Sequence, residues 1–265
     1  MTQVSDSYLG WSGTRRAAWY EWSVYLKTWR GSVISNFLFP IFYLGSMGIG
    51  IGHLVGSHAG LINGHRYLAF VAPGLVATTA MQLAAGESMW PVLGGIKWTK
   101  TYQAAIATPL EAKDVITGRL FFVMARLLVT TITYTLVVAA FGALSSWWAL
   151  LLPLVGLLTG MAFAAPLSAY SCTLENDATF TLVQRFIIVP MFLFSATFYP
   201  LSSYPSYLHP VVELIPLYHG VALSRDVAFG EGTLTTIATH LAVLCGLVII
   251  GVYFARRNFE KRLMV

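Results

Sequence analysis

The chain alternates between long apolar runs and short polar connections, and this pattern predicts a helical membrane protein. A helix needs about 20 mostly apolar residues to cross the hydrocarbon layer of a bilayer. Six segments meet this requirement, so we expect an all-α polytopic fold with six transmembrane helices. The predicted spans cover residues 33–55, 68–92, 119–143, 147–172, 179–199 and 234–255.

Residues 1–32 are predicted to form a cytoplasmic tail and an amphipathic helix ahead of the membrane domain at 33–265. Such a helix is suited to lie along the inner membrane surface. The alternative is a soluble helix that packs on a partner domain. One helical face collects Ala18, Trp22, Tyr25, Leu26 and Trp29, and the opposite face collects Arg16, Tyr20, Ser23, Lys27 and Arg30.

The connection at about 94–118 is longer than a tight turn and is polar, basic and partly helical. The pair Thr108-Pro109 breaks the chain before a helix that begins near Leu110. Its alternating charged and aromatic residues suit docking of a cytoplasmic partner, although an ordinary loop would also explain them.

The segment at about 200–232 is too apolar for a free outer loop and too interrupted to span the bilayer. Backbone at membrane depth must be hydrogen-bonded or packed against protein, so we expect short outer re-entrant helices here. Four prolines divide the segment: Pro200, Pro205, Pro210 and Pro216.

Small residues at four-residue spacing predict close helix packing in the membrane. They occur in the first span as Gly48, Gly52 and Gly56, and in the fourth as Gly156 and Gly160. Packing within the chain and packing between subunits remain equally open. Prolines inside the spans should kink their helices; these are Pro40, Pro153, Pro166 and Pro190.

The composition excludes a soluble enzyme and a free binding module. Hydrophobic residues make up 57% of the chain and charged residues 10%, too few to cover a soluble surface. With 16 Phe, 13 Tyr and 8 Trp, the chain also lacks the signature of disorder. Cys172 and Cys245 both lie in apolar runs, so neither a disulfide framework nor a zinc site is predicted.

The net charge of +5 does not indicate nucleic-acid binding, because most basic residues lie beside apolar runs. There they set membrane orientation. With the N-terminus inside, 14 of the 16 lysines and arginines are cytoplasmic, and only Arg66 and Arg225 lie outside. We therefore expect a multi-pass protein of the cell membrane with both termini in the cytoplasm.

Few groups suited to chemistry are present. No G-x-x-x-x-G-K-[ST] sequence occurs, so the chain has no P-loop for nucleotide. Histidines such as His53, His58 and His65 lack a diagnostic metal spacing, and neither a metal site nor a catalytic residue is predicted. Glu87 and Arg126 fall at similar depth in neighbouring spans, so they either pair or face interfacial water separately.

Both connections resemble those of type-2 ABC exporter permeases, and within that class the nodulation lipo-oligosaccharide and daunorubicin-type drug permeases. The outer likeness rests on Phe194-Ser195, Phe198-Tyr199-Pro200, Pro205, Pro216-Leu217, His219 and Arg225. Ala196 and Tyr204 depart from the usual glycine and leucine, which blurs the subfamily. The inner likeness rests on Glu87, Lys100-Thr101-Tyr102, Ala107-Thr108-Pro109-Leu110 and Asp114.

The resemblance implies a half-transporter in which two permease chains, identical or different, sit above two separate ABC ATPase chains. This chain would bind no cofactor, since ATP and Mg²⁺ belong to the ATPase. The substrate would be amphiphilic (a lipid-linked or lipo-oligosaccharide, a glycolipid or a hydrophobic drug), and membrane lipid would surround the chain. ATPase coupling would involve Lys100, Tyr102, Thr108, Pro109, Lys113, Asp114, Glu175 and Asp177; the exit would be shaped by Phe198, Pro200, Pro205, Pro216, His219 and Arg225.

Two other classes of function would require different sequence features. An ion-coupled secondary carrier would be expected to have midplane acidic residues or an internal repeat. A membrane-embedded lipid enzyme would be expected to have His, Asp or Cys clustered at one membrane depth. Neither pattern is seen in this sequence.

Overall fold

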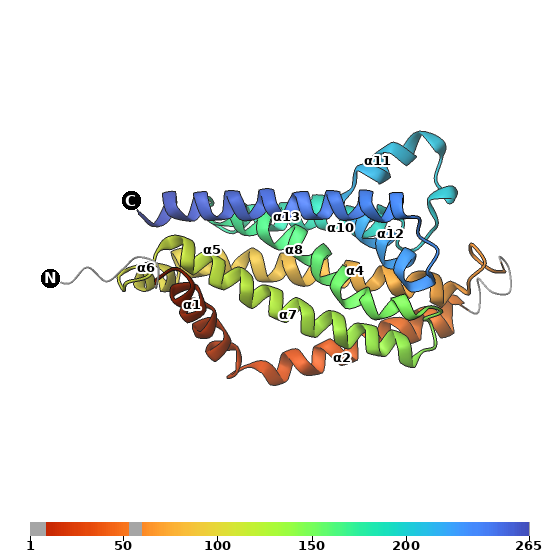
Figure 1. Cartoon of the computed structure of the whole chain (residues 1–265), viewed down its shortest axis with the longest axis horizontal. Coiled ribbons are helices and arrows are strands. Elements are labelled where there is room, and N and C mark those ends of the chain that lie inside the picture. Colours follow the sequence, from red (N-terminus) through yellow and green to blue (C-terminus); the bar gives the residue numbers. More distant parts are fainter. Residues whose placement is uncertain (1–8, 53–59, 265) are drawn as a thin grey trace.

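The computed structural model describes residues 9–52 and 60–264, and the regular structure of these residues is helical. The long helices run side by side along one axis (Figure 1). We call the end of this bundle that carries α6 (Thr101–Ile106) the inner end. The opposite end, which carries α11 (His209–Leu214), is the outer end.

Four of the six predicted spans are confirmed as helices long and apolar enough to cross a membrane. They are α4 (Tyr67–Ser88) continued by α5 (Trp90–Lys97), α7 (Ala112–Ala140), η3 (Trp147–Leu151) continued by α8 (Leu152–Ser171), and α13 (Leu234–Leu263). α7 starts earlier and α13 ends later than predicted. Both extensions lie at the inner end, where polar residues continue the helices.

The first and fifth predicted spans differ from these four. The first is helical as α2 (Trp29–Gly45) and the π-helix η2 (Ser46–Ile51), and residues 53–55 lie outside the described residues. The fifth is a shorter apolar helix, Ala178–Phe194. It comprises α9 (Ala178–Val183), the π-helix η4 (Gln184–Ile188) and α10 (Val189–Phe194).

Two local features explain the shape of this fifth helix. Pro190 has no N–H and its ring crowds the preceding turn, and the helix widens to a π-helix just before it. The helix ends before the predicted Tyr199, because Ala196 adopts the left-handed conformation with φ of 57°. Pro200 then holds the chain extended.

α4 and α8 form the centre of the bundle, where α8 packs against α4, α7 and α13. Gly156 and Gly160 make this packing possible. A Cβ at Gly160 would lie 2.6 Å from a methyl carbon of Leu127, and one at Gly156 would lie 2.6 Å from Thr131 Cγ2. Both contacts are with α7 of the same chain, so these glycines serve intrachain packing. Of the first-span glycines, Gly56 lies outside the described residues.

The N-terminal helix is shorter than predicted. α1 (Leu9–Tyr25) ends in a turn, and α2 begins at Trp29. The predicted apolar face therefore stops at Tyr25, with Leu26 in the turn. α1 crosses α7 at the inner end, where Trp22 and Tyr25 pack against Phe122 at ring-centroid distances of 6.3 and 5.9 Å (Figure 1). Part of that face thus contacts protein of the same chain.

The outer segment contains four short helical pieces: η5 (Leu201–Ser203), η6 (Ser206–Leu208), α11 and α12 (Pro216–Phe229). Proline lies in the first turn of both α11 and α12, where its missing N–H costs nothing. α12 has 14 residues, too few to cross a bilayer, and it packs against α4, α8 and α13. α12 is therefore folded into the bundle, whereas α11 packs mainly against α12 and η6.

Candidate functional site: a buried charge network and the inner face

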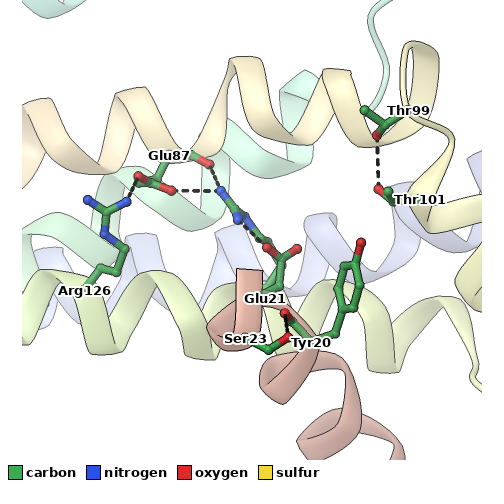
Figure 2. A network of polar contacts seen from close by, with 8 residues as sticks. Tyr20, Glu21, Ser23, Glu87, Thr99, Thr101 and Arg126 are labelled. Carbon is green, nitrogen blue, oxygen red and sulfur yellow. Dashed lines mark hydrogen bonds and ion pairs between the residues drawn. The ribbon is translucent and has the colours of Figure 1, made fainter. Parts of the chain in front are cut away.

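Glu87 of α4 and Arg126 of α7, the two charged residues predicted at similar depth in neighbouring spans, form an ion pair. Figure 2 shows their side chains pointing at each other across the gap between the two helices. Glu87 also accepts a hydrogen bond from Arg119, which lies nearer the inner end of α7. The distance from Arg119 Nη2 to Glu87 Oε2 is 2.9 Å. The same Nη2 lies 2.8 Å from the Glu87 carbonyl oxygen. Two arginines of α7 thus bind one acidic residue of α4.

α1 completes this network. Glu21 Oε2 accepts a hydrogen bond from Arg119 Nη1 at 2.8 Å. The Arg119 side chain is only 5% exposed, and both glutamates are largely buried. Two carboxylates and two guanidinium groups balance in charge, which offsets the cost of removing them from water. The network ties α1, α4 and α7 together at one depth.

Aromatic rings close the network on one side. The Arg126 guanidinium lies 4.7 Å from the ring centre of Tyr25, and that of Arg119 lies 5.1 Å from the ring centre of Phe122. Both distances fit cation–π contacts. Since Tyr25 and Phe122 also contact each other, the end of α1 is held by charge and by packing.

Asp114, predicted as an ATPase contact, is buried and works inside the chain. Its Oδ1 accepts from Thr14 Oγ1 of α1 at 2.9 Å, and its other oxygen takes part in a capping box with Glu111 at the start of α7. A Cβ at Gly13 would lie 2.4 Å from Asp114 Oδ2. The residue therefore fixes α1 on α7, and its part in ATPase coupling stays a prediction.

One turn further along α7, Gly118 forms a second close contact with α1. A Cβ at Gly118 would lie 2.6 Å from Ala17 Cβ and 2.8 Å from the Ala18 backbone nitrogen. Only glycine fits between the two helices here, because the second of these neighbours is backbone. We call the contacts of α1 with Asp114, Gly118 and Arg119 the α1–α7 seam.

The inner connection, α6 and its flanks, is anchored by Tyr102. This side chain is buried against Gly95 of α5 and Phe259 of α13, 5.6 Å between ring centres for the second. Burial raises the pKa of the Tyr102 phenol. Lys100 adopts the left-handed conformation that turns the chain into α6, and a hydroxyl contact of 3.3 Å between Thr99 and Thr101 spans this turn (Figure 2).

The remaining coupling candidates are exposed at the inner end: Lys100, Thr108, Pro109, Lys113, Glu175 and Asp177. Glu175 lies in the connection between α8 and α9 and forms ion pairs with Lys97 and Arg262. These hydrogen bonds hold the pKa of the Glu175 carboxyl below its usual range. They join the ends of α5 and α13 to the connection between α8 and α9. This connection and the inner connection around α6 therefore share one surface.

At the outer end, Arg225 of α12 turns inward. Its Nη2 donates to the carbonyl oxygens of Ala196 and Thr197 at 2.7 Å each, and its Nε donates to that of Phe70 at 3.1 Å. The guanidinium also stacks on the Phe70 ring at 3.7 Å. It thereby fixes the strained turn after α10 to both α4 and α12.

The other outer motif residues divide between packing and turns. Phe198 is buried and meets Phe192 edge-on at 5.2 Å. Pro200 and Pro205 precede short 3₁₀ turns, and Pro216 opens α12. His219 Nδ1 lies 2.8 Å from Nδ1 of His240 on α13.

This arrangement can be compared with known proteins. Residues 14–229 match the ABC-2 type transporter family. This region runs from Thr14, which contacts Asp114, to the end of α12. The chain belongs to the ABC-2 type transporter family. Its members are membrane subunits of transporters, and the subunit is not itself catalytic.

Curated relatives of this family member extend the match to α13. Nodulation protein J of Rhizobium leguminosarum bv. viciae is 27% identical over 258 residues, covering 97% of this chain and 96% of the relative. Nodulation protein J of Rhizobium meliloti (strain 1021) is 26% identical over 256 residues, with 96% and 94% covered. The inner membrane transport permease YadH of Escherichia coli (strain K12) is 26% identical over 172 residues, 62% of this chain and 66% of that protein.

No cluster suited to metal chemistry occurs among residues 9–52 and 60–264 of this ABC-2 protein. His53 and His58 lie outside that part of the chain. His65 stacks on Phe229 at 3.7 Å between ring centres and lies 3.4 Å from Glu231. The described residues form the membrane subunit of a transporter, and most of their charged groups lie towards one end of the bundle.

Proposed function

We propose that this chain is the permease subunit of an ATP-driven ABC exporter. It would move an amphiphilic substrate, such as a lipid-linked or lipo-oligosaccharide, a glycolipid or a hydrophobic drug, out of the cytoplasm or the inner leaflet. The observation that carries the proposal is the shared inner surface of α6 and the 173–177 connection. Its exposed residues are those that the family resemblance assigns to ATPase coupling.

A separate ABC ATPase would bind this inner surface. A hollow of about 260 Å³ lies between α1 and α6, lined by residues that include Arg16, Tyr20 and Thr108. Such a hollow beside exposed charges suits a protein partner that inserts a side chain. ATP and Mg²⁺ would be bound by that partner.

The contacts behind this surface suit transmission of a movement into the membrane. α6 is tied to α5 and α13 through Tyr102, and α1 is tied to α4 and α7 through the charge network. Closure of the ATPase pair would press on α6 and α1 together. Rigid packing and fixed ion pairs then make the spans move as units rather than deform locally.

The proposed orientation places the inner end in the cytoplasm of a cell whose membrane the chain crosses six times. The start of α1 and the end of α13 lie at that end, which fits an even number of crossings (Figure 1). α2 with η2, and Ala178–Phe194, would supply the first and fifth crossings.

A second permease chain, identical or different, would cover the helix Ala178–Phe194. One side of this helix carries exposed apolar side chains, with Phe186 72% exposed, while Phe180 and Ile188 on its other side are buried within the chain. Beside it lies an aromatic hollow of about 620 Å³, whose lining includes Tyr43, Phe192 and Tyr204. Aromatic and apolar walls of this kind fit an amphiphilic substrate near its exit.

The ATPase contact is tested by charge reversal on the inner surface. In the double variant Lys100→Glu/Asp177→Lys, we expect co-purified ATPase and its stimulated hydrolysis to fall about tenfold, because reversed charges repel a complementary partner. Both side chains are exposed, so folding should be retained. The control is Arg66→Glu, an exposed charge at the outer end.

Two results would count against the proposed surface. One is ATPase binding by the double variant at the level of the unmodified chain. The other is an equal loss in the Arg66→Glu control, which would point to a general effect of charge.

A further inference from the structure

A cavity of about 600 Å³ opens near the inner end where α1, α7, α8 and α13 meet. Its walls are apolar over most of their surface, and they include Phe121, Met124 and Met161. Its basic members are Lys113 in the first turn of α7 and Arg256 of α13. One space thus combines a charged part with an apolar part.

The acidic side chain in this cavity is already engaged. Asp114 accepts from Thr14 and belongs to the capping box of α7. Lys113 forms an ion pair with Glu111, but its side chain remains half exposed. The cavity therefore presents more available donors than acceptors.

Arg256 is the residue most available to a ligand. Its Nε donates to Thr117 Oγ1 at 3.1 Å, which fixes the guanidinium beside the cavity. Within residues 9–52 and 60–264, no carboxylate forms an ion pair with it. The side chain is exposed, and its terminal nitrogens have the planar geometry that matches a phosphate group.

A second hollow of about 560 Å³ lies along α13 and shares Val252 and Arg256 with the first. Its other lining residues are the apolar Val248, Ile249 and Tyr253 and the oppositely charged Arg257 and Glu260. Arg256 therefore lines two mostly apolar hollows at once. A headgroup attached to two hydrocarbon chains has this same division of charged and apolar parts.

We propose that these two hollows, the α13 groove, bind one anionic phospholipid of the leaflet at the inner end. Its phosphate lies on Arg256 and Lys113, and its acyl chains run along the apolar walls towards the bundle centre. Basic pockets between membrane helices are known to suit acidic lipid headgroups. The site does not depend on the proposed ATPase coupling, since lipid binding requires only this chain.

The test is a lipid titration of the purified, delipidated full-length chain, with bound lipid counted by native mass spectrometry. We expect phosphatidylglycerol to bind with at least about tenfold higher affinity than phosphatidylcholine, and Arg256→Gln to remove that preference. Lys261→Gln is the matched control, since it removes an exposed charge of the same helix that does not line the groove. It should leave the preference intact.

Val252→Trp separates the contribution of apolar contacts to lipid binding from the contribution of charge. The substitution fills the space between the two hollows and changes no charge. We expect it to weaken phosphatidylglycerol binding, and we expect millimolar inorganic phosphate not to displace the lipid. An equal effect of Arg256→Gln and Lys261→Gln would overturn the proposal in favour of general surface attraction. Displacement by phosphate, or unaltered binding in Val252→Trp, would equally overturn a lipid site.

Discussion

Replacing Glu87 by glutamine is expected to lower the stability of the folded chain by about 3–5 kcal/mol, since one partner of a buried ion cluster is lost. Arg126 would lose its ion pair with this carboxylate, and Arg119, which is only 5% exposed to water, would keep its contact with Glu21. In detergent solution this corresponds to a melting temperature lower by about 10 °C. Differential scanning fluorimetry of the purified protein measures it.

Two comparisons separate the network from general effects. Glu213→Gln changes an exposed carboxyl at the outer end and should shift the melting temperature by less than about 2 °C. The double variant Glu87→Gln/Arg126→Gln should be less destabilised than the sum of its single variants, because it removes a pair together. Additive losses would mean that the ion pair contributes no coupling.

The substitution Gly118→Ala is expected to detach α1 from α7. The added methyl would meet Ala17 Cβ and the Ala18 nitrogen below 3 Å, and overpacking of this kind costs about 1–3 kcal/mol. Separation of the helices would also break the hydrogen bonds of Thr14 with Asp114 and of Glu21 with Arg119. We expect trypsin to cut faster at the turn between α1 and α2, and ATPase stimulation to fall with it.

Gly86→Ala is the matched control for this experiment. Gly86 is also a helical glycine, but nothing lies within 4 Å of an added Cβ there. Alanine should stabilise the helix by about 0.5–1 kcal/mol and leave proteolysis unchanged. If Gly118→Ala behaved like Gly86→Ala, the close seam between α1 and α7 would be refuted.

The sequence predicted the four long spans because hydropathy over 20 residues is a strong signal for a membrane helix. The fifth helix was harder to delimit, since Ala178–Phe194 continues into apolar residues that are not helical. Its end depends on the left-handed backbone at Ala196 and on carbonyl oxygens that accept from Arg225. That contact crosses 29 residues, so no local pattern contains it.

The network was only partly visible in the sequence. Equal depth in adjacent spans pointed to Glu87 and Arg126, and they do form an ion pair. The sequence gives no sign that Arg119 and Glu21 join this pair, because nothing local shows that α1 folds back on α7. The glycines at 13 and 118 were a possible signal, since small residues permit close helix approach.

Asp114 shows how one local pattern can carry two meanings. A charged residue after a basic loop suggested a surface contact with a partner. The spacing of Glu111 and Asp114 also suits the first turn of a helix, where acidic side chains bond to free backbone N–H groups. The structure shows the capping box, with the acid buried beneath α1, and the contact with a partner stays a prediction.

We propose that this ABC-2 chain moves its substrate only when a separate ATPase drives it. The most direct test reconstitutes the purified chain in vesicles with a fluorescent short-chain glycolipid, with and without its ABC ATPase, and follows transfer between leaflets by quenching. We predict ATP-dependent transfer only when both proteins are present, and none with an ATPase that cannot hydrolyse ATP. Transfer by the permease chain alone, or transfer that is independent of ATP, would contradict the account.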